Sequence, residues 1–170
     1  MDRRTLLAIF TVITASCGGA QHAREAERVP LGQARAVEVL EEVVRERDVG
    51  DPTQNVEARL GTSTPVNVDV LVLAIGAGYV YLTEQDRRAT GQIPPQAERS
   101  DLYAVRGELP RGQELLLLIM QDTDFTYLPN PRPDDRQPED RTIDDVEARL
   151  RRDARDFLQA VIDLRGGQSR

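Results

Sequence analysis

The sequence predicts a single α+β domain, in which two amphipathic helices cover one face of a mainly antiparallel sheet of about four strands. Three observations predict this class. Apolar residues recur at helical spacing near both ends of the chain. Between them lie short apolar runs bounded by glycine and proline, as is typical of strands. No internal repeat is visible. We place the domain at 31–166 and a short tail at 167–170.

The first helix is expected over about 31–47. Its apolar positions recur in steps of three and four, and Gly50, Asp51 and Pro52 end the pattern. Glutamate and arginine occupy the other positions, which we interpret as a solvated face. The apolar face consists of Leu31, Ala34, Val37, Leu40 and Val44.

A β-hairpin is expected next. Residues 66–75 begin in alternation and become continuously apolar, as in a strand whose two faces are both covered. Gly76-Ala77-Gly78 interrupts the run, and strand character resumes over 79–83. The interruption lacks the third glycine, the lysine and the following helix of a phosphate-binding loop, so we interpret it as a turn.

The central part of the chain alternates between loops and short apolar runs. Residues 84–100 are charged and rich in turn formers, which predicts a long surface loop, and 101–109 fit a short strand or a short helix equally well. Residues 115–121 are fully apolar and predict a buried strand. A polar step then leads to 125–128, and the proline-rich segment 129–141 predicts an extended loop.

The last helix, expected over about 143–165, has the clearest start and stop signals. Thr142 and Asp145 form a capping box, and Gly166-Gly167 ends the pattern. Its apolar stripe could serve as a dimer seam, but we interpret it as a face of the core. The stripe consists of Ile143, Val146, Leu150, Ala154, Phe157, Val161 and Leu164.

Composition excludes several kinds of chemistry. The net charge is −7, which disfavours nucleic acids and anionic lipid headgroups as partners. The chain has no lysine, so a lysine Schiff base or general base is excluded. Cys17 is the only cysteine and His22 the only histidine, and both precede the domain. Disulfides within the chain, thiol catalysis and histidine-centred sites are therefore not expected, and no cofactor is assigned.

The N-terminal residues predict an export signal. Arg3-Arg4 precede about ten apolar residues, a length too short to span the ~30 Å hydrocarbon core of a bilayer. Thr14-Ala15-Ser16-Cys17 resembles the lipobox of bacterial lipoproteins, with threonine where the family prefers leucine. A general secretory signal cut near Ala20, a retained anchor and a twin-arginine signal are the alternatives.

The lipoprotein resemblance implies how the chain is attached. Residues 1–16 would be the signal peptide, Cys17 the acylated first residue, and 17–30 a polar tether. Several acyl chains hold a protein firmly at a membrane, so the domain would need no membrane-binding surface of its own. Gly18 follows the cysteine where aspartate would favour the inner membrane. The resemblance therefore implies the outer membrane of a bacterial cell envelope, facing the periplasm.

The densest acidic region contains Asp122 and Asp124, followed in the next loop by further carboxylates. Oxygen ligands on loops could hold calcium, and two carboxylates could act as acid and base in glycan hydrolysis. Aspartates at strand ends are also ordinary turn formers. The spacing lacks the glycine and glutamate of an EF-hand loop, so we interpret these residues as surface positions and assign no metal or catalytic residue. The further carboxylates are Asp134, Asp135, Glu139 and Asp140.

Two aromatic pairs suggest a binding surface. Tyr79 and Tyr81 lie two apart on one predicted strand, and so do Phe125 and Tyr127 on another, so each pair points to one face of its strand. Neighbouring strands would combine them into a patch that could stack on a sugar ring or a partner side chain. Alternatively, the tyrosines pack beneath a helix. The candidate binding surface therefore comprises Tyr79, Tyr81, Phe125, Tyr127, Asp122 and Asp124.

Residues 66–128 also show a loose family resemblance. A strand pair, a possible short helix near 101–109 and an apolar strand running into an acidic turn and Tyr127 resemble the periplasmic domain of biopolymer-transport subunits of the ExbD and TolR kind. The resemblance implies a small α+β fold. It does not extend to the transmembrane helix that couples those subunits to a proton motor.

These patterns predict a membrane-anchored envelope lipoprotein that acts as a non-enzymatic protein-binding module with an envelope protein as its partner. A carbohydrate- or peptidoglycan-binding module is the first alternative. A carboxylate-based hydrolase built around Asp122 and Asp124 is the second.

Overall fold

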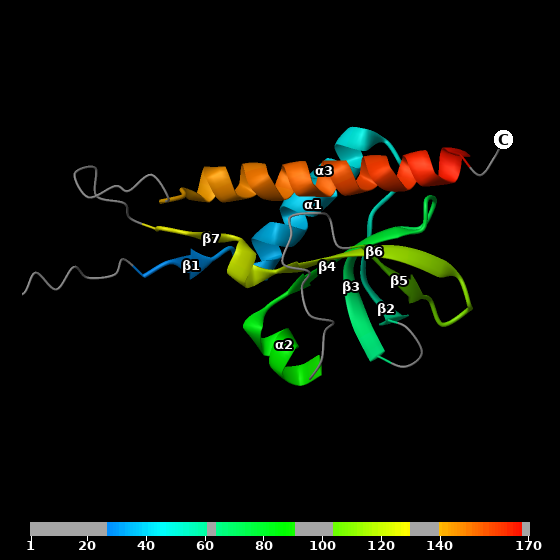
Figure 1. Cartoon of the computed structure of the whole chain (residues 1–170), viewed down its shortest axis with the longest axis horizontal. Helices are drawn as coiled ribbons and strands as arrows, with labels where there is room; N and C mark the ends of the chain where they lie inside the picture. The colour runs from blue at the N-terminus through cyan, green and yellow to red at the C-terminus, as the bar shows by residue number, and fades with distance from the viewer. Residues whose placement is uncertain (1–26, 61–63, 91–103, 130–139, 168–170) are drawn as a thin grey trace, which may run out of the picture.

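A computed structural model describes residues 27–60, 64–90, 104–129 and 140–167, and it confirms the α+β class (Figure 1). Three helices surround two sheets in the described parts of the chain. The predicted signal peptide (1–16), Cys17, most of the tether and residues 168–170 of the tail lie outside the described residues.

The main sheet is a closed barrel of five strands, where the sequence predicts a sheet of about four strands covered on one face. The strand order is β2-β3-β4-β6-β5, with β5 returning to β2. All neighbours are antiparallel except β4 and β6, which are parallel because the chain between them crosses over through α2 and β5. The strands are β2 (Thr53–Leu60), β3 (Thr64–Val72), β4 (Ala77–Leu82), β5 (Ala104–Glu108) and β6 (Glu114–Gln121).

This strand order is that of an OB-type Greek-key barrel. The β3–β4 hairpin and the strand at 115–121 are confirmed, and the undecided segment 101–109 contains a strand. The turn of the hairpin lies at 73–76, so the predicted turn at 76–78 is wrong: Ala77 and Gly78 already belong to β4 and pair with β3. β2 has no counterpart among the predicted elements. Its inward residues Val56, Ala58 and Leu60 do alternate, but polar residues dominate the rest of the segment.

Two glycines explain how so small a barrel closes. Leu117 of β6 is fully buried inside it, between Gly78 of β4 and Gly107 of β5. A Cβ on Gly78 would lie 2.8 Å from a methyl of Leu117, and a Cβ on Gly107 would lie 2.6 Å from the other methyl. Leu117 therefore fits inside the barrel because Gly78 and Gly107, which flank it, have no side chains.

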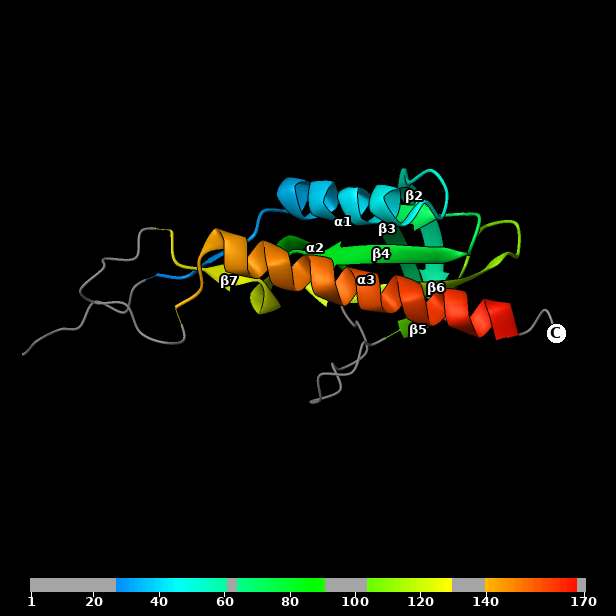
Figure 2. The same cartoon turned by 90° about the horizontal axis from the view of Figure 1, so that it is seen from above.

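The two long helices, α1 (Gln33–Arg47) and α3 (Ile143–Gly167), lie side by side on the outer face of β3, β4 and β6 (Figure 2). Their apolar faces and the outward residues of these strands form one core cluster. The two predicted helices are present, but they cover part of the outer wall of a closed barrel and not one face of a four-stranded sheet. In α1 the predicted Ala34 is exposed, and Ala36, Val39 and Val43 are buried with Leu40 and Val44. The apolar stripe of α3 belongs to that core from Val146 to Val161, whereas Ile143 and Leu164 at its two ends are exposed.

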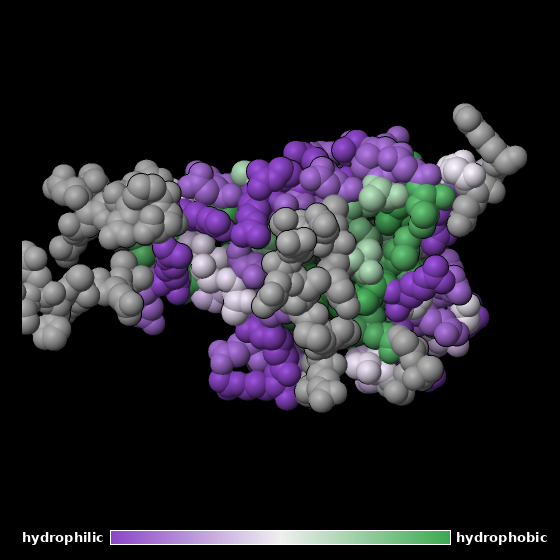
Figure 3. Space-filling model, viewed as in Figure 1, coloured by the Kyte–Doolittle hydropathy of each residue, from purple (hydrophilic) through white to green (hydrophobic). Residues whose placement is uncertain are grey.

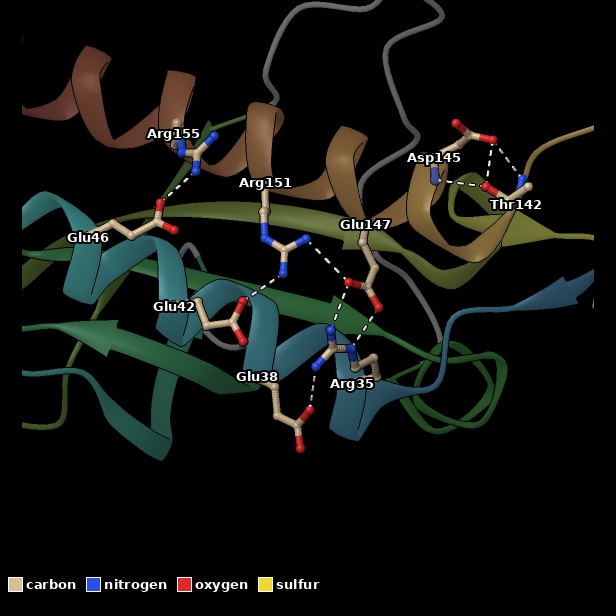
Figure 4. A network of polar contacts seen from close by, with 9 residues as sticks. All are labelled: Arg35, Glu38, Glu42, Glu46, Thr142, Asp145, Glu147, Arg151 and Arg155. Carbon is tan, nitrogen blue, oxygen red and sulfur yellow. Dashed lines mark hydrogen bonds and ion pairs between the residues drawn. The ribbon is translucent and has the colours of Figure 1, made fainter.

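Charged side chains join the two helices along their outer seam (Figure 4). Glu147 of α3 accepts two hydrogen bonds from Arg35 of α1, at 2.7 and 2.8 Å, and one from Arg151 at 3.3 Å. Arg151 also reaches Glu42, and Arg155 reaches Glu46. These contacts hold α1 and α3 in register over several turns.

The capping box of α3 is confirmed. Thr142 Oγ1 accepts a hydrogen bond from the N–H of Asp145, and the Asp145 carboxylate accepts from the N–H and hydroxyl of Thr142. The side of α3 seen in Figure 3 is mostly hydrophilic, as the charged positions of its sequence predict. An apolar area lies below its C-terminal half.

The prediction of a loop over 84–100 is wrong for its first residues, because they form the helix α2 (Glu84–Thr90). The signal was a second capping box, in which Thr83 and Asp86 repeat the spacing of Thr142 and Asp145. The helix is short and mostly polar, so no apolar periodicity marks it. Residues 91–100 lie outside the described residues.

A small second sheet ties the start of the domain to its acidic turn. β1 (Val29–Pro30) pairs with β7 (Thr126–Tyr127), and the N–H of Leu31 donates to the carbonyl of Phe125 at 2.8 Å. The end of the predicted tether, 17–30, is therefore part of the fold. The 3-10 helix η1 (Asp122–Asp124) leads from β6 into β7, and the 130–139 part of the predicted loop lies outside the described residues.

Candidate functional site

The barrel has an irregularity where β3 and β4 separate. Their pairing runs from Val72–Ala77 to Val70–Tyr79 and goes no further, although both strands continue. At the same point the side-chain alternation of β3 shifts by one residue. Val66 and Val68 belong to the barrel interior, whereas Val70 and Val72 belong to the cluster beneath the helices.

Asp69 lies at the residue where the side-chain alternation of β3 shifts, and the neighbouring part of β2 is irregular too. Asn55 has a φ of 54°, in the left-handed region, and lies between the pairs Gln54–Val70 and Val56–Val68 that flank Asp69. Asparagine tolerates this conformation better than most residues do. The irregularity therefore involves two adjacent strands and opens the barrel wall locally.

The side chain of Asp69 occupies the opening. Its Oδ2 accepts a hydrogen bond from the N–H of Tyr81 at 2.7 Å, and its Oδ1 accepts one from the side-chain amide of Gln33 at 2.8 Å. The residue is only 4% exposed. Burial raises the pKa of the Asp69 carboxyl above its usual range, and the two hydrogen bonds oppose that rise.

A groove of about 460 Å³ lies over the opening, within the range of small-ligand sites. Its charged lining side chains are Glu57, Asp69 and Asp86, all acidic. Side-chain amides supply most of the other polar groups, and one of them, on Asn67, donates to Asn55 at 3.3 Å. The full lining is Gln33, Asn55, Glu57, Pro65, Val66, Asn67, Asp69, Val80, Tyr81, Leu82, Asp86 and Ala89.

Five elements line the groove. β2, β3, β4 and α2 each supply lining residues, and α2 contacts both β3 and β4. The first turn of α1 contributes Gln33. Asp86 is held in place because its carboxylate accepts from the N–H and hydroxyl of Thr83 at the start of α2. The walls are thus held by the same hydrogen bonds that start α2 and bridge β3 to β4.

The aromatic surface expected from the sequence is not exposed. Tyr79, Tyr81 and Phe125 are buried, and only Tyr127 is half-buried. The hydroxyl of Tyr79 donates to the carbonyl of Ala154 at 2.9 Å, and that of Tyr81 donates to the carbonyl of Leu31 at 2.8 Å. The two tyrosines thus pack beneath the helices, which was the alternative interpretation.

Tyr81 and Phe125 do come together, with ring centroids 6.0 Å apart, although β4 and β7 do not pair: β7 pairs with β1, and Phe125 lies just before β7. Tyr79 instead packs edge-on against Phe157 of α3 at 5.4 Å. The prediction missed the burial because the strand pattern does not tell which face two helices cover. These rings stabilise the core and the position of α3.

Asp122 is a structural anchor of α2. It is nearly buried, and it accepts from the N–H of Glu84 at 2.9 Å and from Arg87 at 2.5 Å. Asp124, at the other end of η1, is half-buried, and its backbone carbonyl accepts from Arg149. A second hollow of about 550 Å³ lies beside Asp122, with Arg87, Arg88 and Glu84 in its lining. The charges there are mixed and partly paired with one another.

Apart from Tyr81, the residues that line the groove were not predicted from the sequence. One signal was present: Asp69 is a single carboxylate inside the apolar run Val66–Ile75. A charged residue in such a run must find partners in the fold. Those partners are Gln33 and the backbone of Tyr81, both far from it in sequence, so the pattern alone does not identify them.

Among the described residues, no cluster of histidine, cysteine, aspartate and glutamate could hold a metal ion. None of the helices described is both long and apolar enough to cross a membrane. Comparison of the chain with protein-family models, with curated proteins and with solved structures finds no match.

Proposed function

We propose that this chain is a lipid-anchored, non-enzymatic module of a bacterial envelope, which binds another envelope protein through the groove at Asp69. The observation that carries the proposal is the groove itself, a 460 Å³ concavity built on strands and lined by a buried carboxylate and three side-chain amides. Sites on strands hold their geometry better than sites on loops, which suits recognition.

The anchor rests on the lipobox-like segment ending at Cys17. A lipid at Cys17 would leave the domain on a tether of about a dozen residues, since β1 begins at Val29. Such a tether lets the groove reach a partner near the membrane without a membrane-binding face on the domain.

The barrel topology supports a binding role, but at a different part of the strands from the one that OB-type barrels use. OB-type barrels use the outer face of their second and third strands to bind oligonucleotides or oligosaccharides. Here these strands are β3 and β4, and α1 and α3 cover that face over Val70, Val72 and Tyr79. Binding by this chain therefore falls to the uncovered end of the same strands, where the groove lies.

The proposal is tested by photocrosslinking in cells. A photoreactive residue replaces Asn67, which lines the groove, and in a matched strain it replaces Glu114 on β6, outside the groove. We expect a specific envelope protein crosslinked from position 67, absent from 114, and reduced by Cys17→Ala. Equal adducts from both positions, or none from 67, would contradict the proposal. Adducts with wall polymer alone would favour a peptidoglycan-binding module instead.

A further inference from the structure

We infer that the groove takes an extended, arginine- or lysine-bearing segment of the partner, which adds a strand to the free edge of β3 and sets a cation beside Asp69. The inference rests on the proposed function, because it names the chemistry of the partner that the same groove would recognise.

The first observation is the free strand edge. From Thr64 to Val68, β3 pairs with β2 on one side and with no described strand on the other. Val80–Leu82 of β4 likewise pair only with β6 among the described strands. On this edge Pro65 and Asn67 are exposed and Thr64 is half-exposed, whereas Val68, Val80 and Tyr81 are buried, so the accessible part of the edge lies at 64–67. Exposed strand edges are templates for β-strand addition, in which backbone hydrogen bonds provide affinity.

The size of the edge matches a short peptide. The five residues of this edge, from Thr64 to Val68, span about 16 Å. Pro65 has no N–H to offer, so the usable donors begin at Val66. Pro65, Val66, Asn67 and Asp69 all line the groove, so a segment beside this edge would lie in the groove and not on open surface.

The second observation is charge. Each of the three charged side chains in the lining is acidic, and the whole chain carries −7. Each oxygen of Asp69 accepts one hydrogen bond in the structure, which leaves further acceptor capacity on both. A guanidinium or ammonium group would supply donors to it and cancel the local negative charge. Charge complementarity therefore selects a basic segment over an acidic one.

The side-chain amides fit the same occupant. Gln33, Asn55 and Asn67 offer both donors and acceptors along the groove. A peptide strand presents N–H and C=O groups at regular intervals, so amides can bind its backbone whatever its sequence. The carboxylates would then set the preference for basic side chains.

The test uses the purified full chain carrying Cys17→Ala, followed by backbone amide NMR. The probes are a capped hexapeptide that alternates arginine and valine, the same peptide with glutamate in place of arginine, and the arginine peptide with alternate backbone nitrogens methylated. We expect the arginine peptide to shift the amides of 64–69 and 80–82. The glutamate and N-methylated peptides should bind at least about tenfold more weakly.

Two variants test which carboxylates of the groove bind the basic side chains of the peptide. Glu57→Gln should weaken the arginine peptide severalfold and Asp69→Asn about tenfold, whereas Glu114→Gln, an exposed strand glutamate outside the groove, should leave its affinity unchanged. Equal affinity for the arginine and glutamate peptides, undiminished binding after methylation, or shifts confined to other elements would overturn the inference. Crosslinking from position 67 together with any of these results would leave the proposed function intact while the inference fails.

Discussion

The carboxylate of Asp69 and the backbone N–H of Tyr81 are 2.7 Å apart, and their hydrogen bond replaces a strand pair. Just beyond the pair Val70–Tyr79, β4 leaves β3, and the N–H of Tyr81 finds a side-chain oxygen in place of a backbone carbonyl. The barrel stays closed while its wall opens enough to form a groove. One residue thus supports the fold and lines the candidate site.

Removing the Asp69 carboxylate should destabilise the fold. Asp69→Ala leaves the buried N–H of Tyr81 and the amide of Gln33 without their partner, at a cost of about 1–3 kcal/mol. Asp69→Asn should cost much less, because its oxygen can accept from Tyr81 and the Gln33 amide can turn to offer its own oxygen. Urea unfolding of the two variants at pH 7 measures the difference. Equal losses would show that the hydrogen bonds contribute little.

The raised pKa of Asp69 predicts the sign of a pH effect. A carboxyl whose folded pKa is raised by burial contributes stability that is fully present below its unfolded pKa and is lost as pH rises through the folded pKa. Asp69→Asn cannot lose a proton. Its stability relative to the native chain should therefore increase between about pH 4 and pH 7. A difference that stays constant over this range would contradict the assignment.

Adding one methyl group inside the barrel should be costly. Gly107→Ala places a Cβ 2.6 Å from a methyl of Leu117, and we expect a loss of about 1–3 kcal/mol in the free energy of unfolding. Gly166→Ala, which meets no atom within 4 Å, is the control and should not destabilise. Leu117→Val in the same chain should recover part of the Gly107→Ala loss. Strict additivity of the two changes would rule out the contact as the cause.

Two acidic residues on the helix seam should differ in importance. Glu147, with 9% of its side chain exposed, accepts from Arg35 and Arg151, and Glu147→Gln should cost about 1–3 kcal/mol. Glu46→Gln breaks a pair with Arg155 that is exposed to solvent on both sides, and it should have little effect on stability. Thermal unfolding of both variants makes the comparison.

The pH dependence of the Glu147 contribution has the opposite sign to that of Asp69. Hydrogen bonds from Arg35 hold the pKa of the Glu147 carboxyl below its usual range. Its contribution is present above the unfolded pKa and is lost as pH falls through the folded pKa. The gap between the native chain and Glu147→Gln should therefore narrow below about pH 4. A gap that widens there would show that the ionised form is not the stabilising one.

Asp122 should stabilise α2. Asp122→Ala removes the acceptor of the Glu84 N–H and of Arg87, so amide hydrogen exchange in α2 should become faster and unfolding easier by about 1–3 kcal/mol. Asp51→Ala, an exposed loop aspartate, is the matched control and should change neither measurement. Unchanged exchange in α2 would show that the anchor is dispensable.

The helices α1 and α3, the hairpin and the strand at 115–121 could be predicted from the sequence because each carries a local signal. Periodicity, capping residues and glycine turns act within about ten residues of one another, and the capping box of Thr142 and Asp145 is seen as predicted. The same kind of signal at Thr83 and Asp86 would have identified α2. Residue type also determined which chemistries the domain lacks, since it has no lysine.

The tertiary structure alone decided that the sheet closes, that Tyr79 and Tyr81 face the helices, and that Asp69 opens a groove. Closure depends on Leu117 meeting Gly78 and Gly107, three residues from three different strands. A strand sequence shows that alternate residues share a face, but it does not show which face another element will cover. Contacts between distant segments make that choice, so the site appears only once the chain is folded.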